Sequence, residues 1–154
     1  MYLFTGSVPT GSKIMKAAAD GIRNITLELG GKSPLIIFDD ADMKNAVKGA
    51  LMANFFTQGQ VCSNAARVFV QRGIYSEFLA KFVEQTKKMK IGDPFNEDTT
   101  VGATISADHA NKVLSYIQGA VKEGAKIECG GERVILEGMY SLPMLLSRGP
   151  IEDP

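Results

Sequence analysis

The sequence predicts an α/β fold with a largely parallel sheet. Short apolar runs of strand length alternate along the chain with longer segments whose apolar residues recur at helical spacing. Glycine pairs or a proline separate these segments, at 30–31, 93–94 and 130–131. Because parallel strands need long crossover connections, helices between successive strands favour a parallel sheet, and ligands bind at the strand ends of such sheets.

The first part of the chain predicts strands at 1–4, 25–29 and 34–38 and a short helix at 11–20. The first strand runs directly into residues 5–7, and Gly30 and Gly31 end the second strand. The third strand is a continuous apolar run, which is typical of a strand buried on both faces. Asp39 and Asp40 follow it, and either carboxylate can accept hydrogen bonds from the start of the next helix.

The second part predicts a helix at about 43–56, a strand at 67–71, an amphipathic helix at 74–90, a loop at 93–102, a third long helix and a strand at 125–129. The core faces of these helices are predicted at Val47 and Ala50 and at Phe78 and Phe82. Ser106 is placed to cap the third helix at its start, and Gly124 to end it in a left-handed conformation.

Composition excludes several classes of protein. With 45% hydrophobic residues and a formal net charge of zero, the chain is neither disordered nor suited to binding nucleic acid. Its apolar runs are far shorter than the roughly 20 residues of a membrane-spanning helix. Two cysteines and no signal segment predict reduced thiols in the cytoplasm.

The turn from Gly6 to Gly11 joins the first strand to the first helix. Its N–H groups and the Ser7 hydroxyl could contact a phosphate at the helix start. The spacing is neither a dinucleotide fingerprint nor a Walker loop, so an ordinary strand-to-helix turn is the alternative.

Glu28 stands in an apolar strand end, directly before two glycines. Desolvation would raise the pKa of its carboxyl toward neutrality, as a general base requires. The alternative is a Glu on the solvent face of an edge strand.

Cys62 lies in a polar loop, where its thiol is accessible and where N–H groups and the Asn64 side chain could surround an oxyanion. The alternative is an inert surface thiol. Cys129 ends an apolar strand and is expected to be a core residue, while His109 is expected to be solvated. We expect no metal site, because the sequence has no second histidine or cysteine cluster to complete one.

Three motifs lie at residues 4–7 with Gly11, at residues 27–34, and at residues 59–64 with Arg67. Together, and in this order, they resemble the signature segments of the NAD(P)-dependent aldehyde dehydrogenase superfamily. Residues 138–143 resemble a further family segment. The amino-acid sequences of residues 34–38 and 48–55 are most similar to those of the branch of betaine-aldehyde and trimethylaminobutyraldehyde dehydrogenases.

The resemblance implies roles for particular residues. Cys62 would be the nucleophile that attacks the aldehyde carbon, with its N–H in the oxyanion hole, and Glu28 the base that activates water to hydrolyse the thioester. The cofactor, NAD or alternatively NADP, would contact Gly6, Ser7, Gly11, Leu29 and Gly30. The implied partners are a small aldehyde, with a quaternary-ammonium aldehyde as first choice, and further copies of the chain in a full-length homo-oligomer. Nucleic acid and membrane are not among them.

The resemblance also implies a partial aldehyde dehydrogenase fold. Residues 1–30 would end the Rossmann-like cofactor domain, residues 31–146 would form an incomplete catalytic domain, and residues 147–154 are a tail that does not match. Ala65 and Ala66 replace the Gly-Thr usual in this branch. Other family motifs, including the second oxyanion-hole Asn and the ribose-binding residues, fall outside the chain, so we expect an internal fragment that does not oxidise aldehydes with NAD on its own.

Two further hypotheses stay open at this point. The first is a non-catalytic family member that acts by associating with full-length subunits. The second is a thiol esterase that uses Cys62 and Glu28 without a cofactor, since thioester hydrolysis needs no NAD.

Overall fold

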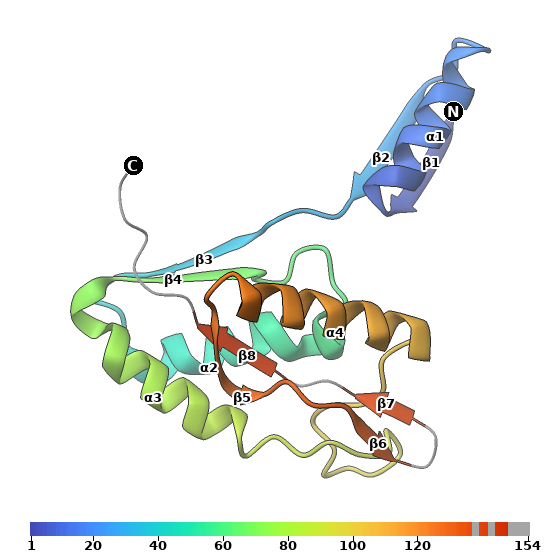
Figure 1. Cartoon of the computed structure of the whole chain (residues 1–154). Coiled ribbons are helices and arrows are strands. Elements are labelled where there is room, and N and C mark those ends of the chain that lie inside the picture. The colour runs from blue at the N-terminus through green and yellow to red at the C-terminus, as the bar shows by residue number, and fades with distance from the viewer. Residues whose placement is uncertain (137–138, 142–143, 148–154) are drawn as a thin grey trace.

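The structure is a computed structural model, and it describes residues 1–136, 139–141 and 144–147. Figure 1 shows two parts, an arm (residues 2–29) that projects from a body (residues 34–147), joined by the extended linker 30–33. Residues 138, 142 and 143 of the family-like segment, and residues 148–154 of the predicted tail, lie outside the described residues.

The arm is a β–α–β unit. Strand β1 (Tyr2–Gly6) pairs in parallel with β2 (Ile25–Leu29), and helix α1 (Val8–Ala19) connects them. The predicted strand 25–29 is confirmed. The helix begins at Val8 rather than at residue 11, because the Ser7 side chain accepts a hydrogen bond from the N–H of Thr10 and caps the helix early.

The body begins with a second parallel pair, β3 (Pro34–Ile37) and β4 (Arg67–Val70), against which α2 (Met43–Phe55) and α3 (Tyr75–Thr86) pack. Two short 3₁₀ turns, η1 (Phe56–Gly59) and η2 (Arg72–Ile74), flank β4 in sequence. The buried core residues are Ile37, Val47, Ala50, Phe55, Phe78 and Phe82. The predicted core faces of the first two body helices are therefore confirmed.

The end of the body contains α4 (Ala107–Lys122), β5 (Lys126–Gly130), β6 (Val134–Leu136), β7 (Met139–Ser141) and β8 (Met144–Ser147). β5 pairs with β8, and β6 with β7, both antiparallel. The described strands thus form two parallel and two antiparallel pairs. The α/β class is confirmed, but the expectation of a largely parallel sheet is wrong for the last four strands, whose connections are too short for crossovers.

Helix α3 ends at Thr86, not at residue 90. The Thr86 hydroxyl donates to the Phe82 carbonyl at 2.8 Å, and beyond it the chain tightens into turns in which Met89 N–H donates to the Thr86 carbonyl. The predictions for α4 are confirmed: Ser106 caps its start by accepting from the His109 N–H, and Gly124 has φ +93° at its end.

The start of α2 corrects a prediction. Asp42 caps this helix by accepting from the Asn45 N–H at 2.7 Å, whereas Asp39 exchanges two hydrogen bonds with Gln71. Asp39 lies too far before the helix to reach its N–H groups, so its carboxylate joins the ends of β3 and β4 instead.

Strand β3 is not buried on both faces. Leu35 and Ile37 face the core, but Ile36 is 58% exposed and Phe38 61% exposed. The helices α2 and α3 cover one face of the β3–β4 pair, which leaves alternate side chains open within the described structure.

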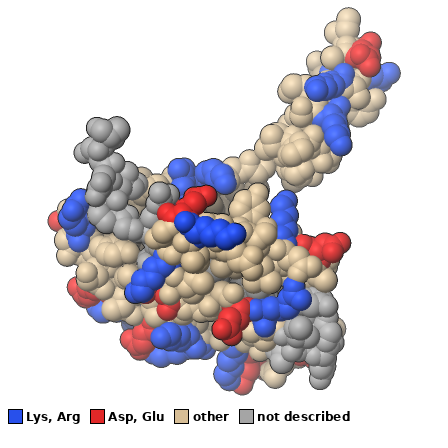
Figure 2. Space-filling view, in the orientation of Figure 1, with Lys and Arg blue, Asp and Glu red and all other residues tan. Residues whose placement is uncertain are grey.

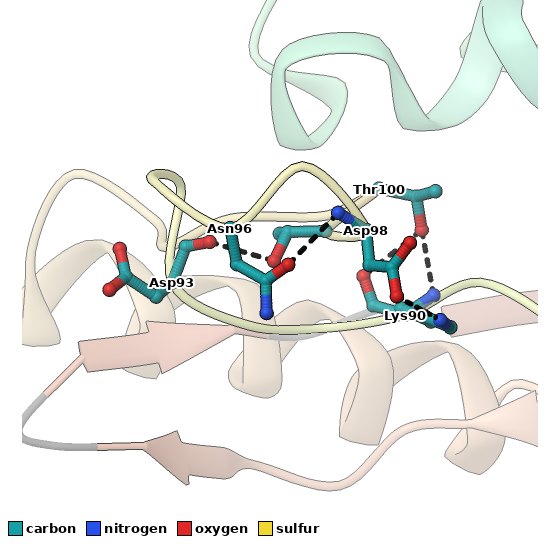
Figure 3. A network of polar contacts seen from close by, with 6 residues as sticks. Lys90, Asp93, Asn96, Asp98 and Thr100 are labelled. Carbon is teal, nitrogen blue, oxygen red and sulfur yellow. Dashed lines mark hydrogen bonds and ion pairs between the residues drawn. The ribbon is translucent and has the colours of Figure 1, made fainter.

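The loop 93–102 is held by its own polar side chains, as Figure 3 shows. Asn96 Oδ1 accepts from the Asp98 N–H at 3.0 Å, and the Lys90 ammonium pairs with Asp98 at 2.7 Å. Lys90 and Thr100 exchange two further bonds. The predicted loop is confirmed, and its hydrogen bonds give it a defined conformation.

Charges of both signs are interspersed over the face that Figure 2 presents. On α3, a hydrogen bond from the Lys88 ammonium holds the pKa of the Glu84 carboxyl below its usual range. None of the helices in the described ranges is long and apolar enough to cross a membrane.

Candidate functional site

The first half of the candidate site is the turn between β1 and α1. β1 ends at Gly6, Ser7 caps the helix, and the Ser7 and Thr10 hydroxyls lie 3.0 Å apart. The first turn of α1 carries no acidic side chain. Its N–H groups therefore present the positive end of a helix dipole, and no carboxylate of that first turn opposes an anion there.

The five residues predicted to contact a cofactor gather at this end of the arm. Gly6 is paired with Leu29 in the strand register, and Gly30 follows directly. Gly11 is buried, and a Cβ there would lie 2.7 Å from the Leu29 side chain. Gly11 thus allows the helix to lie close against the strand ends where a ligand could bind.

Glu28 is opposite Thr5 in the β1–β2 register, and its side chain is exposed. Of the two alternatives for Glu28, the described structure has the one with the side chain on the solvent face of the strand. The strand alternates half-buried Leu27 and Leu29 with exposed Glu28, and Leu29 lies against Gly11 of α1. Exposure leaves the carboxylate accessible to water.

The second half of the site is the Cys62 turn, residues 61–64. The Asn64 N–H donates to the Val61 carbonyl at 3.1 Å, so Cys62 is a central residue of a β-turn. Its side chain is exposed, as predicted. Among the described residues its N–H has no acceptor. An accessible thiol beside an unpaired N–H is suited to adding to a carbonyl carbon while the N–H receives the oxygen.

The backbone before this turn is strained. Thr57, Gln58 and Gly59 all have positive φ values, of 50°, 53° and 73°. A left-handed conformation is unfavourable for a β-branched residue such as Thr57, at a typical cost of about 1–3 kcal/mol. The Gln60 N–H, which donates to the Thr57 carbonyl at 2.9 Å, helps to hold it.

The Asn64 side chain makes a contact that the sequence did not predict. Its amide donates to the carbonyl of Phe56 at 3.1 Å, where α2 ends. Helix ends leave carbonyls without partners, and Asn64 satisfies one of them. The side chain therefore links the Cys62 turn to the end of α2.

The linker 30–33 connects the two halves. The Ser33 hydroxyl donates to the Cys62 carbonyl at 3.3 Å, and the Arg67 guanidinium donates to the Lys32 carbonyl. No hydrogen bond joins Glu28 to Cys62 within the described ranges. Sequence reasoning included Arg67 in a motif but missed these contacts, because residues about 30 positions apart give no local signal.

The remaining candidates are less exposed than Cys62. Cys129 is half-buried in β5 and not fully buried in the core as expected, and His109, expected to be solvated, is half-buried in the first turn of α4. The part of the chain that the structure describes holds no group of three or more His, Cys, Asp or Glu side chains that could bind a metal ion.

The chain matches a known protein family and known relatives over almost its whole length. The model of the aldehyde dehydrogenase family matches residues 1–152, which includes most of the segment 147–154. The chain is 56% identical over 150 residues to 4-trimethylaminobutyraldehyde dehydrogenase from Bos taurus, covering 94% of this chain and 30% of that protein. The chain thus spans about a third of the length of this relative.

The solved structures that the chain resembles are also aldehyde dehydrogenases. Betaine aldehyde dehydrogenase from Staphylococcus aureus in complex with NAD+ has a TM-score of 0.90 and 44% identity over 94% of this chain and 29% of that one. The NAD+ complex of aldehyde dehydrogenase from Bacillus cereus also has a TM-score of 0.90, with 40% identity and the same two coverages. The partial fold predicted from the motifs is therefore confirmed.

Proposed function

Because this chain belongs to the aldehyde dehydrogenase family, we propose that it supplies the two reacting side chains for the NAD-dependent oxidation of an aldehyde to a carboxylic acid. The observation that carries the proposal is the Cys62 turn, with an exposed thiol and a main-chain N–H that has no acceptor among the described residues. The complete activity belongs to a protein of the relatives' length, of which this chain spans about 30%.

Cys62 is the nucleophile of the proposed reaction. Its thiolate adds to the aldehyde carbon and forms a thiohemiacetal, and the Cys62 N–H donates to the developing oxyanion. Loss of hydride from that carbon leaves a thioester on the Cys62 sulfur. The hydrogen bonds of Asn64 to Val61 and Phe56 support this role, because they hold the turn in one geometry.

Glu28 is the proposed base for the second half of the reaction. Its carboxylate takes a proton from a water molecule, which attacks the thioester carbon and releases the acid and the Cys62 thiol. The exposure of Glu28 supports this role, since water reaches the carboxylate. The exposed linker glycines, Gly30 and Gly31, have no atom near the position of a Cβ and leave room for this approach.

The β1–α1 turn fits the phosphates of a dinucleotide, NAD or alternatively NADP. The helix start without acidic side chains, the close packing of Gly11 on Leu29, and the placing of Gly6, Ser7 and Gly30 at the same strand ends support this fit. The dinucleotide, when bound, supplies the hydride acceptor. Two structurally similar proteins were solved with NAD+.

The proposed substrate is a small aldehyde, and one with a quaternary ammonium group is the first to try. This choice is supported by the names of the relatives, which act on 4-trimethylaminobutyraldehyde and betaine aldehyde. Aromatic faces usually recognise such cations. The reduced thiols fit a cytoplasmic location, and a homo-oligomer is the proposed assembly of the full-length protein.

A chimera tests the proposal, in which this chain replaces the matching segment of the Bos taurus relative. We expect NADH formation from 4-trimethylaminobutyraldehyde in the chimera, loss of it in Cys62→Ala, and its retention in Cys129→Ala. Turnover that survives Cys62→Ala, or a folded chimera without activity, would overturn the proposal.

The role of Glu28 is tested in the same chimera. Glu28→Gln should retain a rapid burst of NADH but slow the later turnover by about 10²-fold or more, because general base catalysis of hydrolysis is worth about that factor. Stopped-flow absorbance separates the two phases. Equal loss of burst and turnover would assign Glu28 to thiol activation or structure.

A further inference from the structure

Arg67 connects β4 to the linker that follows the arm. Its Nε and Nη2 donate to the Lys32 carbonyl at 3.0 and 2.5 Å. The guanidinium lies over the Phe69 ring, with Cζ 5.5 Å from the ring centroid, so an aromatic face orients it. Hydrogen bonds from a charged donor are the stronger class, and two from one guanidinium give a directed contact.

The next residue of the linker contacts the Cys62 turn. The Ser33 hydroxyl donates to the main-chain carbonyl of Cys62 at 3.3 Å. The Ser33 carbonyl in turn accepts from the Arg67 N–H at 3.3 Å. The side chains of Arg67 and Ser33 thus form a continuous set of contacts from β4 through the linker to the main chain of Cys62.

The segment between Glu28 and Ser33 is short, so contacts that fix the linker also limit where Glu28 can lie. Five peptide steps separate Glu28 from Ser33, and this segment can span at most about 18 Å when extended. Gly30 and Gly31, within it, are the least restrained residue type. A catalytic carboxylate must lie within about 3 Å of its proton donor, so a small change in the direction of the linker moves Glu28 out of reach.

We propose that Arg67 and Ser33 are positioning residues that fix the linker 30–33 against the Cys62 turn and so set the approach of Glu28 to Cys62. This inference rests on the proposed function. Both residues act through main-chain carbonyls.

The other end of the same strand pair supplies a matched control. The Gln71 amide donates to Asp39 Oδ2 at 2.8 Å, and Gln71 Oε1 accepts from the Asp39 N–H at 2.9 Å. Like Arg67, Gln71 makes two side-chain hydrogen bonds across β3 and β4, but at the end away from Cys62. The main-chain ladder, including the Arg67 N–H bond, involves neither side chain, so we expect it to persist when either is substituted.

The first experiment uses the 154-residue chain. We expect Arg67→Gln to accelerate hydrogen exchange in the linker by about tenfold. The reason is that the loss of a charged hydrogen bond of modest strength changes the opening equilibrium of the linker by about that factor. Alkylation of Cys62 by iodoacetamide, followed by mass spectrometry over a range of pH, should change in rate by several-fold. Gln71→Ala should change neither. Equal changes in both variants, or none in Arg67→Gln, would overturn the proposal.

The second experiment measures catalysis in the chimera. Arg67→Gln should lower kcat with little change in KM for the aldehyde, Arg67→Lys should recover part of the loss, and Gln71→Ala should leave kcat unchanged. Ser33→Ala, which removes one hydroxyl, gives a second test if Arg67→Gln does not fold. An active chimera whose kcat is unaffected by Arg67→Gln and Ser33→Ala overturns the positioning role alone. An inactive unsubstituted chimera overturns the proposed function, and the positioning role falls with it.

Discussion

The arm and the body are stabilised in different ways. The body buries a cluster of large side chains, in which Phe82 is 2% exposed and its ring centroid lies 5.4 Å from that of Phe78. The buried residues of α1 in the arm are small, Gly11 and Ala18. Apolar side chains of β1 remain open, with Leu3 71% exposed. Since buried apolar area is the main source of stability, we expect the arm to open more readily than the body.

This difference divides the candidate site. Glu28 and the helix start at Ser7 belong to the arm, whereas Cys62 belongs to the body and is held through Asn64 to the end of α2. The proposed nucleophile therefore lies on the part that we expect to be more stable, and the proposed base and cofactor turn lie on the part that we expect to be less stable. The placement of Glu28 relative to Cys62 depends on the linker, which Ser33 and Arg67 hold through their hydrogen bonds.

Phe82→Ala is the strongest test of the difference. It should lower the free energy of unfolding of the body by about 3–5 kcal/mol, the usual cost of removing a buried phenyl ring. Urea titration followed by far-UV circular dichroism measures it. Phe95→Ala, at a residue 95% exposed, is the matched control and should change the stability by less than about 0.5 kcal/mol.

Hydrogen exchange in Phe82→Ala shows whether the two parts unfold together. We expect exchange to accelerate in α2 and α3 while the amides of β2 change little. If β2 is affected as much as α3, the arm and the body form one cooperative unit and the comparison fails.

Gly11→Ala tests the packing of the arm. A Cβ at Gly11 would lie 2.7 Å from Leu29, so the leucine must move. Overpacking typically costs about 1–3 kcal/mol, and the better helix propensity of Ala offsets roughly 1 kcal/mol of it. We expect a net loss of protection in α1 and β2 by hydrogen exchange, with Cys62 alkylation unchanged.

Gly119→Ala is the control for this substitution, because Gly119 also lies inside a helix but has no atom within 4 Å of the position of a Cβ. It should stabilise the chain by about 0.5–1 kcal/mol. A gain of stability at both glycines would show that α1 is not packed closely on β2.

Glu84→Gln is expected to have the smallest effect. The Lys88 ammonium lowers the pKa of the Glu84 carboxyl, so the pair stabilises the fold above the ordinary carboxyl pKa and loses that contribution as the pH falls through the lowered pKa. Both side chains are exposed, so screening keeps the contribution small. Urea titrations at neutral and acidic pH should show a slightly weaker dependence on pH in Glu84→Gln. A stronger dependence would contradict the sign.

Residues near one another in sequence were predicted well. Ser106 and Gly124 mark the ends of α4, and the spacing of Phe78 and Phe82 identifies the buried face of α3. These features depend on hydrogen bonds and side-chain contacts within a few residues, which composition and periodicity reflect. The exposure of Cys62 in its polar loop was predicted for the same reason.

Predictions failed where a distant partner decides the outcome. Asp39 follows a strand and precedes a helix, as a cap does, but its carboxylate bonds with Gln71 on the neighbouring strand. The bond from the Asn64 amide to the Phe56 carbonyl was not predicted, because the end of α2 presents that carbonyl only in the folded chain. Neither partner follows from local pattern.

The sequence by itself determined the α/β class, the two ends of α4, the core faces of α2 and α3, and the motifs that identify the family, because each of these depends on residues a few positions apart. Tertiary structure alone decided that Glu28 is exposed, that the last strands pair antiparallel, and that Ser33 and Arg67 join the linker to the Cys62 turn. The physical reason is that burial and long-range hydrogen bonds depend on which segments meet in space, and residues about 30 positions apart meet only once the chain has folded.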